Sequence, residues 1–281
     1  MKVICIINLK GGVAKTISAI NIAHILATKH GKQVLLIDND KQGNTSKFFG
    51  LHSYENLSFA DVLTSKDPDT ILKAIKITEY NDYESGYYLH VLPANMNLLH
   101  ADRQILIDTG RPQQTRLKKA LQVLIDTNAS YDYVVIDNAP DLNMSVVNAI
   151  VAANDILIPI KVDKFAFDGL DQLLEQVEEL REFNPNLRIA GGFITMYSKN
   201  NVNIQGVEVL GEKKGLPMFE TVIRNTVKVN ETTYTGEPIT AYAPKSTAAK
   251  DYDALVDEYL RVSERAKDAR SARYVSETIT K

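Results

Sequence analysis

Two lysines flank a glycine-rich turn near the start of the chain. Residues 6–16 read Ile-Ile-Asn-Leu-Lys-Gly-Gly-Val-Ala-Lys-Thr and lie between an apolar run and a helical pattern. Glycines let successive backbone N–H groups point inward at phosphate oxygens, and the following helix adds the positive end of its dipole. Lys15 would then reach the β- and γ-phosphates of a nucleotide, and the Thr16 hydroxyl would ligate Mg²⁺. The spacing therefore predicts a phosphate-binding loop.

Aspartates end two further apolar runs. The first run closes with Leu36-Ile37-Asp38-Asn39-Asp40, and a later one closes with Val134-Val135-Ile136-Asp137. Carboxylates at the carboxyl ends of strands beside a phosphate loop suit coordination of Mg²⁺ through water and orientation of an attacking water. A strand that ends in aspartate is a Walker B arrangement, in which Asp137 holds Mg²⁺ through water. We therefore expect both segments to end beside the phosphate loop.

Strand and helix patterns alternate along the chain and must position these side chains. Several of the apolar runs are apolar on both faces, which is typical of strands buried under helices on either side. The alternation predicts an α/β fold, a doubly wound and mostly parallel sheet with helices on both faces. The predicted strands are Val3–Asn8, Val34–Asp38, Tyr133–Asp137, Ile156–Ile160, Ile189–Thr195 and Phe219–Ile223. The predicted helices are Thr16–Lys29, Pro112–Asn128, Met144–Ala153, Asp168–Phe183, Asn203–Lys214 and Thr247–Ala272.

The patterns favour a single domain over residues 1–262. Residues 51–130 form an expected insertion, mostly helical and without a core of its own, between the second strand and the strand that ends at Asp137. Within it, Phe59–Leu63 and Asp69–Lys76 look helical and Tyr88–Leu92 looks like a short strand. Residues 263–281 form a polar tail whose last eight or so residues we expect to fray.

Composition excludes several classes of protein. The 281 residues include 32 Lys and Arg and 35 Asp and Glu, so the net charge of −3 gives no global attraction to nucleic acid. A single cysteine, Cys5, excludes disulfide scaffolds and zinc or iron–sulfur clusters built from cysteines within the chain. The longest apolar runs are too short for a membrane span, and the strand-like start leaves no room for a signal peptide. We therefore expect a cytoplasmic protein.

The phosphate loop departs from the general pattern G-x-x-x-x-G-K-[ST], because Ala14 precedes Lys15. It fits K-G-G-x-x-K-[ST] instead, and so resembles the deviant Walker A motif of the ParA/MinD ATPases. Residues 38–44 resemble the switch I pattern D-x-D-P-Q-G-N of that family, with Lys41 in place of the proline. Residues 242–246, Tyr-Ala-Pro-Lys-Ser, fit the family pattern Y-x-P-K-S. The resemblance runs from residue 2 to about residue 262.

This resemblance implies roles for individual residues. Lys10 corresponds to the lysine that reaches across a dimer interface to the phosphates of the partner's ATP. Asp40 corresponds to the residue that activates water, and Asp38 lies nearer the metal shell. The implied cofactors are ATP and Mg²⁺, with Thr16, Asp38 and Asp137 at the metal. The implied nucleotide-binding residues are Lys10, Gly11, Gly12, Val13, Ala14, Lys15, Thr16, Ile17 (through its backbone N–H) and the adenine-binding turn Ile223, Arg224 and Asn225.

The resemblance also implies partners. The loop begins at residue 10, so we expect the short, Soj-like type without an N-terminal DNA-binding extension. The tail lacks the bulky apolar face of the lipid-binding helix of MinD, which disfavours membrane binding. A single cysteine excludes the related nitrogenase iron proteins. The implied function is a nucleoid-associated ATPase for plasmid or chromosome segregation, which dimerises on ATP and is stimulated by a ParB-like partner.

Binding to nonspecific DNA would rest on local basic residues. Residues 226–231 align with the family segment N-V-R-L-S-E, which places Lys228 at a DNA-contacting arginine. The other candidates for DNA contact are Arg224, Lys245, Lys250 and Lys199. Two alternative functions stay open at this point: a ParA-like ATPase that positions a protein cargo, and a nucleotide-gated binding protein with negligible hydrolysis.

Overall fold

The chain folds around one seven-stranded sheet with the strand order β3-β4-β2-β5-β1-β6-β7. The computed structural model describes residues 1–127, 129, 131–163, 168–212 and 216–279. Neighbouring strands are parallel, except that β3 runs antiparallel to β4 at the edge. The strands are β1 (Lys2–Ile6), β2 (Gln33–Asn39), β3 (Lys76–Asp82), β4 (Tyr87–Leu92), β5 (Tyr133–Asn138), β6 (Asp155–Lys161) and β7 (Arg188–Thr195).

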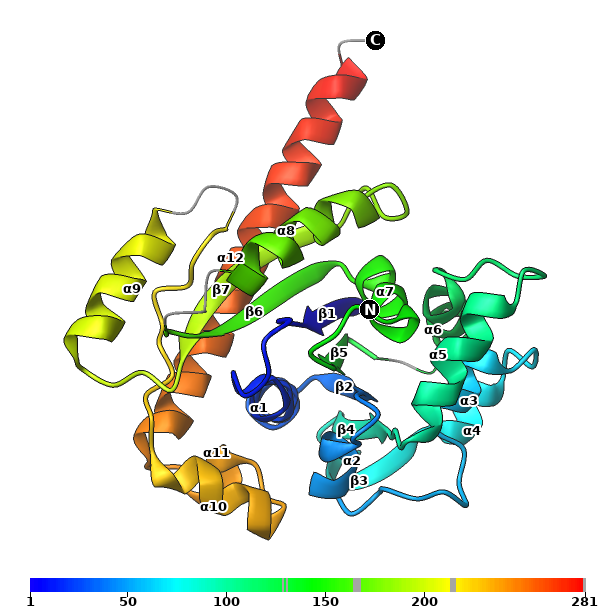
Figure 1. Cartoon of the computed structure of the whole chain (residues 1–281), viewed down its shortest axis with the longest axis horizontal. Coiled ribbons are helices and arrows are strands. Elements are labelled where there is room, and N and C mark those ends of the chain that lie inside the picture. Colours follow the sequence, from blue (N-terminus) through cyan, green and yellow to red (C-terminus); the bar gives the residue numbers. More distant parts are fainter. Residues whose placement is uncertain (128, 130, 164–167, 213–215, 280–281) are drawn as a thin grey trace.

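Helices cover both faces of this sheet (Figure 1). Side chains of β1 alternate between two apolar layers, because successive residues of a strand point to opposite faces. Val3 and Cys5 pack in the layer of α3, α5, α6, α7 and α8, whereas Ile4 and Ile6 pack in that of α1, α11 and α12. The doubly wound α/β fold is thus confirmed. The helices are α1 (Lys15–Thr28), α2 (Asn44–Phe48), α3 (Phe59–Thr64), α4 (Thr70–Ala74), α5 (Asn97–Ile107), α6 (Arg116–Asp126), α7 (Met144–Ala152), α8 (Asp168–Leu180), α9 (Asn201–Gly211), α10 (Val227–Thr235), α11 (Ile239–Tyr242) and α12 (Thr247–Ile279).

Residues 51–130 contribute two strands to the sheet. β4 pairs with β2 in parallel from Gln33 with Tyr88 to Ile37 with Leu92, and β3 adds an antiparallel edge. The sequence did not predict β3, because its residues Lys-Ile-Thr-Glu-Tyr-Asn-Asp are mostly polar and only partly buried. The predicted helix Asp69–Lys76 is shorter in the structure, where α4 ends at Ala74 and Lys76 begins β3. Helix α5 was also not predicted.

The predicted strand Phe219–Ile223 is wrong. This segment follows the edge of β7 through two isolated bridges, Gly192 with Met218 and Tyr197 with Arg224. Between them, the backbone N–H groups of Glu220 and Thr221 donate to the carboxylate of Glu258 on α12, at 2.8 and 3.0 Å. One carboxylate from another element therefore binds two consecutive N–H groups, which in a regular strand would point to opposite sides.

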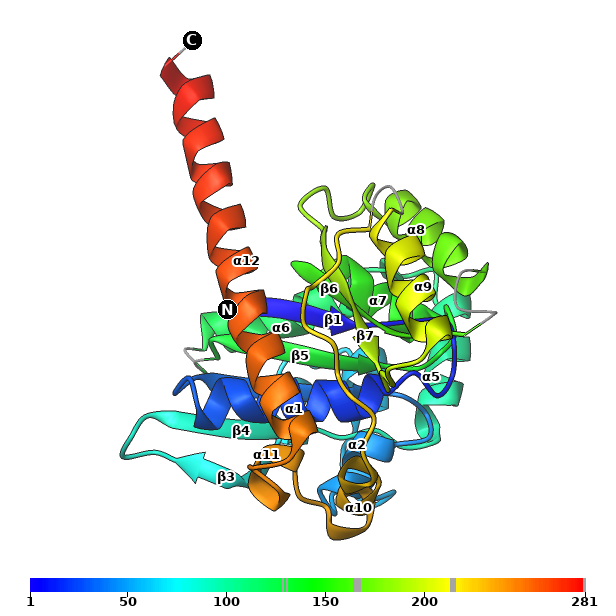
Figure 2. The ribbon, with the colours of Figure 1, turned by 90° about the vertical axis from the view of Figure 1, so that its left-hand side faces the viewer.

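Helix α12 extends past the predicted end at Ala272 and includes most of the segment that we expected to fray. It packs along α1 and then projects from the body of the molecule (Figure 2). Before it projects, its Ser263 hydroxyl accepts a hydrogen bond from the ammonium of Lys2 on β1. In the described part of the chain, no helix is both long and apolar enough to cross a membrane. The predicted helix ends at Asn128 and Lys214 fall outside the described residues.

Candidate functional site

The loop between β1 and α1 has an open face lined by backbone. A side-chain carbon built at Gly11 or Gly12 would meet no atom within 4 Å, so this face is free to receive a ligand. The loop is anchored from behind: the Asn8 carboxamide accepts from Lys10 N at 2.9 Å, and the Thr195 hydroxyl donates to the Val13 carbonyl at 3.1 Å. Helix α1 begins at Lys15, so its free N–H groups face the same loop.

Ala14 stands where the general phosphate-loop pattern has glycine, and its backbone shows why. It adopts φ 64° and ψ 30°, the left-handed conformation. A side chain there costs roughly 1–2 kcal/mol relative to the right-handed form. The loop therefore keeps the conformation of a phosphate loop despite the methyl group, and holds some strain in doing so.

Lys15 is buried in the loop, with only 7% of its surface exposed. Its ammonium donates to the Lys10 carbonyl at 2.8 Å, which curls the loop around the side chain. Burial lowers the pKa of Lys15, whereas the negative charges of Asp137, Asp40 and Asp141 raise it. A buried cation beside three carboxylates and an open backbone cradle is an arrangement that suits a polyanionic ligand.

Asp38 and Asp137 are register partners on adjacent strands β2 and β5. Both are fully buried. One oxygen of Asp38 accepts from the Ser46 backbone N–H at 2.8 Å and from its hydroxyl at 2.6 Å. Burial raises the pKa of Asp38 to about 6 against these hydrogen bonds. The Asp38 carboxylate thus ties the start of α2 to the end of β2.

Asp137 keeps one oxygen without a partner. Its Oδ2 accepts from the Thr45 hydroxyl at 2.8 Å, whereas Oδ1 is buried and accepts no hydrogen bond. Burial first, and then the charge of Asp38, raises the pKa of Asp137 to about 7, and the Thr45 and Thr16 hydroxyls lower it. A buried, unpartnered carboxylate oxygen beside a phosphate loop is costly unless a cation faces it.

These donors fit Mg²⁺. The ion takes one or two carboxylates together with waters and phosphate oxygens, and here Asp137 and Thr16 would hold it with Asp38 behind them. Bound there, it would neutralise charge on the phosphates. No cluster of three or more His, Cys, Asp or Glu ligands occurs among the described residues. Asp137 offers one unpartnered carboxylate oxygen, which suits an ion that shares its remaining ligands with a bound nucleotide.

The switch segment after β2 is shaped by Gly43. Its φ of 64° is left-handed, and a side-chain carbon there would lie 2.7 Å from the His52 ring and 2.8 Å from the Ala94 carbonyl. Asp40 stands half-buried before this turn, and its carboxylate accepts from Gln42 N at 2.9 Å. Its charge raises the pKa values of both Lys15 and Asp137. The structure thus brings Asp40 to the edge that holds the loop and the metal residues.

The switch segment differs from the family pattern at Lys41, where that pattern has proline. The Lys41 ammonium pairs with the Asp141 carboxylate at 2.8 Å and so joins the switch segment to the loop after β5.

Two asparagines that the sequence reasoning missed hold the strand ends together. Asn138 donates to the carbonyls of Ile6 and Ile136, at 3.0 and 3.2 Å, and so joins β1 to β5. Asn39 donates to the Asn138 carboxamide oxygen at 2.8 Å and extends this link to β2. Both asparagines directly follow the strand-end aspartates, and this repeated Asp-Asn was the available signal.

The Lys10 side chain is held by a carboxylate from another part of the sheet edge. Its ammonium pairs with the Asp163 carboxylate, which follows β6, and 28% of its side chain is exposed. The Lys10 backbone carbonyl meanwhile accepts from Lys15. The Lys10 backbone is therefore part of the phosphate loop, whereas its ammonium is partly exposed and accessible to a second molecule.

The remaining loop residues and the predicted adenine-binding turn differ in their surroundings. Val13 is buried, and Ile17 packs partly buried against the layer of α1 and α12. The Ile223 side chain is buried in the same layer, so only its backbone could face a ligand. Asn225 N donates to the Tyr197 carbonyl at 2.9 Å, just beyond β7. Arg224 binds Asp251 of α12, with the closest atoms 2.6 Å apart.

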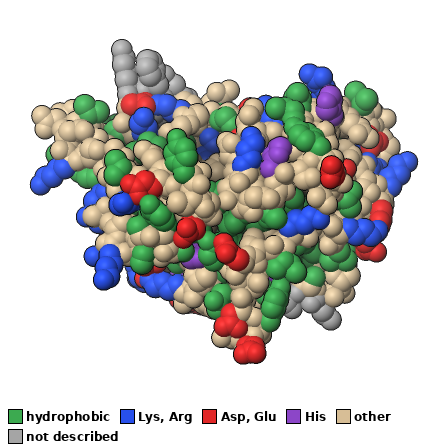
Figure 3. All heavy atoms as spheres, turned by 90° about the horizontal axis from the view of Figure 1, so that it is seen from below, with side chains coloured by type: hydrophobic (Ala, Val, Ile, Leu, Met, Phe, Trp, Pro, Cys, Tyr) green, Lys and Arg blue, Asp and Glu red, His purple; other side chains and the backbone are tan. Residues whose placement is uncertain are grey.

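The candidate DNA-contacting lysines are all exposed, and the structure brings two of them together. Lys228 and Lys245 line one surface groove, with Thr226 and Ala243–Thr247. Lys250 follows one turn into α12, and Lys199 precedes α9. Figure 3 views the molecule from the lower side of Figure 1, where α10 lies, and shows basic and acidic side chains interspersed. The described surface on this side therefore carries no single basic block.

Comparison with known proteins agrees with this geometry. The family model of an AAA domain matches residues 1–189. The chain is 35% identical to the chromosome partitioning protein ParA of Caulobacter vibrioides, over 97% of this chain and 98% of the relative. It is 33% identical to the sporulation initiation inhibitor protein Soj of Bacillus subtilis, over 92% of this chain and 97% of the relative.

A solved structure shares the fold. Cobyrinic acid a,c-diamide synthase from Mycobacterium smegmatis, with a bound ATP analogue and magnesium, superimposes with a TM-score of 0.77 at 28% identity. The alignment covers 94% of this chain and 96% of that one. The phosphate loop, the paired strand-end aspartates and these similarities lead to one conclusion: the chain belongs to the ParA family of partition ATPases, which are ATP hydrolases.

Proposed function

We propose that this protein is a DNA-segregation ATPase that works as an ATP-dependent dimer. ATP and Mg²⁺ bind at the phosphate loop, and two molecules then close face to face over their nucleotides. The dimer binds DNA without sequence preference, and a ParB-like partner stimulates hydrolysis and so releases it. The observation that carries this proposal is the open loop face at Gly11 and Gly12, with the Lys10 ammonium at its rim.

The chemistry within one subunit is phosphoryl transfer to water. Lys15 and the N-terminus of α1 would hold the phosphates, and Asp40 would orient the attacking water. Asp38 and the two asparagines would keep the strand ends in register while the reaction proceeds. We expect slow intrinsic turnover, because each site is completed only when a second subunit supplies its Lys10, and in the single subunit that lysine is paired with Asp163.

The first test concerns the dimer. In Lys10→Ala we expect ATP to bind a single subunit with nearly normal affinity, because Lys15 still neutralises the phosphates. Dimerisation should weaken strongly, since the contact that Lys10 makes lies across the interface. Sedimentation with ATP measures this, and Lys118→Ala on the distant helix α6 is the matched control. A Lys10→Ala protein that dimerises like Lys118→Ala would contradict the face-to-face dimer.

Support for DNA binding comes from the groove beside α10. It is lined by Lys228 and Lys245, and the N-terminal residues of two helices, α10 and α12, border it. Backbone N–H groups at helix N-termini bind phosphate without reading base sequence. Lys228 is held by Glu231 at 2.8 Å, so a phosphate must compete with this carboxylate. We therefore expect weak contacts that depend on salt and are doubled in a dimer.

The second test reverses one charge in this groove. Lys228→Glu should weaken DNA binding and flatten the slope of log affinity against log salt by roughly one unit for each DNA phosphate that the protein no longer neutralises. ATP binding and dimerisation should survive, because Lys228 lies outside the phosphate cradle. Fluorescence anisotropy over a salt series measures the slope, with Lys118→Glu as control. If the salt slopes of Lys228→Glu and Lys118→Glu are equal, this groove is not the DNA-binding surface, and Lys199 or the last helix is the next candidate.

The proposal as a whole is tested by measuring DNA binding with ATP, with ADP and without nucleotide. Binding with ATP alone is the expected result. If no DNA binds with ATP at any salt concentration, the segregation function gives way to positioning of a protein cargo.

A further inference from the structure

A pocket of about 190 Å³ lies between α3, α4 and α6, and none of its lining residues belongs to the phosphate loop or the switch segment. Much of its wall is apolar and comes from Val62 and Leu63 of α3, Ile71 of α4 and Ala120 of α6. All four side chains are buried. The pocket is therefore a preformed hollow with a firm apolar wall rather than a gap between mobile surface groups.

The remaining lining is strongly basic. It carries four cationic side chains, those of Lys66, Arg111, Arg116 and Lys119, and one carboxylate, Asp67. Asp67 is already paired with Lys73, a lysine outside the lining, at 2.7 Å. This concentration of positive charge stands on a chain whose net charge is −3. The pocket is therefore electrostatically suited to an anion.

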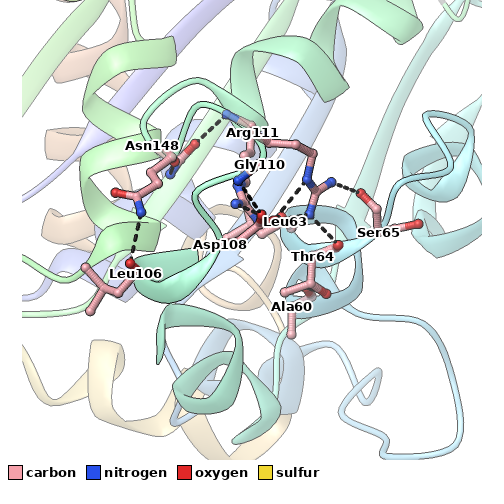
Figure 4. Close-up of polar contacts among 11 residues, drawn as sticks. Ala60, Leu63, Thr64, Ser65, Leu106, Asp108, Gly110, Arg111 and Asn148 are labelled. Carbon is pink, nitrogen blue, oxygen red and sulfur yellow. Dashed lines mark hydrogen bonds and ion pairs between the residues drawn. The ribbon is translucent and has the colours of Figure 1, made fainter. Parts of the chain in front are cut away.

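Two guanidinium groups share one carboxylate beside this pocket. Oδ2 of Asp108 accepts from Arg111 at 3.0 Å and from Arg116 at 2.9 Å. Arg111 also donates to the carbonyls of Ser65 and Thr64, at 2.6 and 2.9 Å, as Figure 4 shows. These bonds hold both arginines in place at the end of α3. They leave one of the two positive charges uncompensated.

One buried donor in the lining has no acceptor. Arg116 is only 6% exposed, and its Nε atom makes no hydrogen bond. Within the part of the chain that the structure describes, Lys66 and Lys119 make no ion pair either, and both are exposed. Native proteins seldom leave a buried charged donor unpaired, because its lost hydration is not replaced. An anionic ligand would supply the missing acceptor.

We propose that this pocket binds a small organic carboxylate. Its carboxylate would be held by Arg116, Lys66 and Lys119, and its apolar body would lie against Val62 and Ala120. A cavity of about 150 Å³ accommodates benzene, so the present one has room for a body of that size. Inorganic phosphate would use the charges but leave the apolar wall without a partner. The site is separate from the nucleotide site and does not depend on the proposed segregation function.

Benzoate is the probe that tests this. Titration of the full chain by calorimetry, with ADP and Mg²⁺ present to occupy the phosphate loop, should show one saturable site per chain. Benzamide has the same shape without the charge and should bind about tenfold more weakly. Inorganic phosphate should also bind more weakly than benzoate. Equal affinities for benzoate and benzamide, or no saturable benzoate binding, would overturn the proposal.

Substitutions locate the site. Lys119→Gln should weaken benzoate binding about fivefold, whereas Lys118→Gln, the same change on the preceding residue, should leave it unchanged. Ala120→Leu should abolish binding by filling the pocket, with its fold checked by circular dichroism. If Lys119→Gln and Lys118→Gln bind benzoate equally well, the pocket is not the site. When the unsubstituted chain and Lys15→Ala are both titrated without nucleotide, loss of benzoate binding in Lys15→Ala would place the probe in the phosphate loop and equally refute the proposal.

Discussion

Replacing Lys15 by alanine should abolish ATP binding. Lys15 is the buried cation of the loop, and its ammonium lies where the β- and γ-phosphates are expected. Removing one partner of a buried charge pair costs about 2–5 kcal/mol, which corresponds to roughly a 30- to 4,000-fold loss of affinity. The Lys10 carbonyl would also lose its donor, so the loop itself should loosen. Calorimetric titration with ATP and Mg²⁺ measures the effect.

Lys10→Ala is the control for Lys15→Ala, because it removes a lysine from the same loop. The two lysines lie in one loop, yet only Lys15 is buried among Asp137, Asp40 and Asp141. Lys10→Ala should therefore bind ATP and fail to dimerise, whereas Lys15→Ala should fail at both. Near-normal ATP affinity in Lys15→Ala would show that the phosphate loop has been wrongly assigned.

Asp40→Ala should separate binding from hydrolysis. The Asp40 carboxylate is half-buried at the edge of the site and contacts Gln42 N rather than the loop, so its removal leaves the phosphate cradle intact. Loss of a group that positions or activates water reduces turnover by about 10²- to 10⁴-fold. The variant should accumulate as an ATP-bound dimer. Phosphate release and light scattering, measured on one sample, report the two effects together.

Asp141→Asn is the control for Asp40→Ala. Asp141 is a carboxylate at the same edge of the sheet, but it is occupied by Lys41 and is not expected to meet the attacking water. We expect this control to keep most of its turnover. Normal turnover in Asp40→Ala would assign the role to another group, and Asp38 would be the next residue to test.

The phosphate loop could be identified from sequence because it is local. Its glycines, its two lysines and the start of α1 fall within a few consecutive residues, so the spacing alone defines which backbone groups converge. The strand-end aspartates were predictable for a related reason, since the carboxyl ends of parallel strands share one edge of the sheet. The order of the strands was not predicted, because the winding rule fixes the hand of a β-α-β unit but not which strands become neighbours.

Prediction failed where a residue's environment comes from distant parts of the chain. β3 is a polar edge strand whose pairing is decided by β4 and not by its own pattern. Phe219–Ile223 has the composition of a strand, but Glu258 of α12 takes two of its backbone donors. The residues of this segment carry no pattern that would predict a contact with a carboxylate on another helix.

For the site, the side-chain types and the strand ends at which they stand follow from the order of residues. How these side chains face one another depends on which strands become neighbours. Asp38 and Asp137 lie side by side because β2 and β5 are adjacent strands in which these two residues are register partners. The Asp137 carboxylate is buried there, and its Oδ1 atom has no hydrogen-bond partner. Lys10 meets Asp163 because β6 runs parallel to β1 and continues past the end of β1, which brings the residue after β6 beside the loop. Charge interactions and desolvation depend on distance in space, which residue spacing along a chain specifies only within one turn or loop.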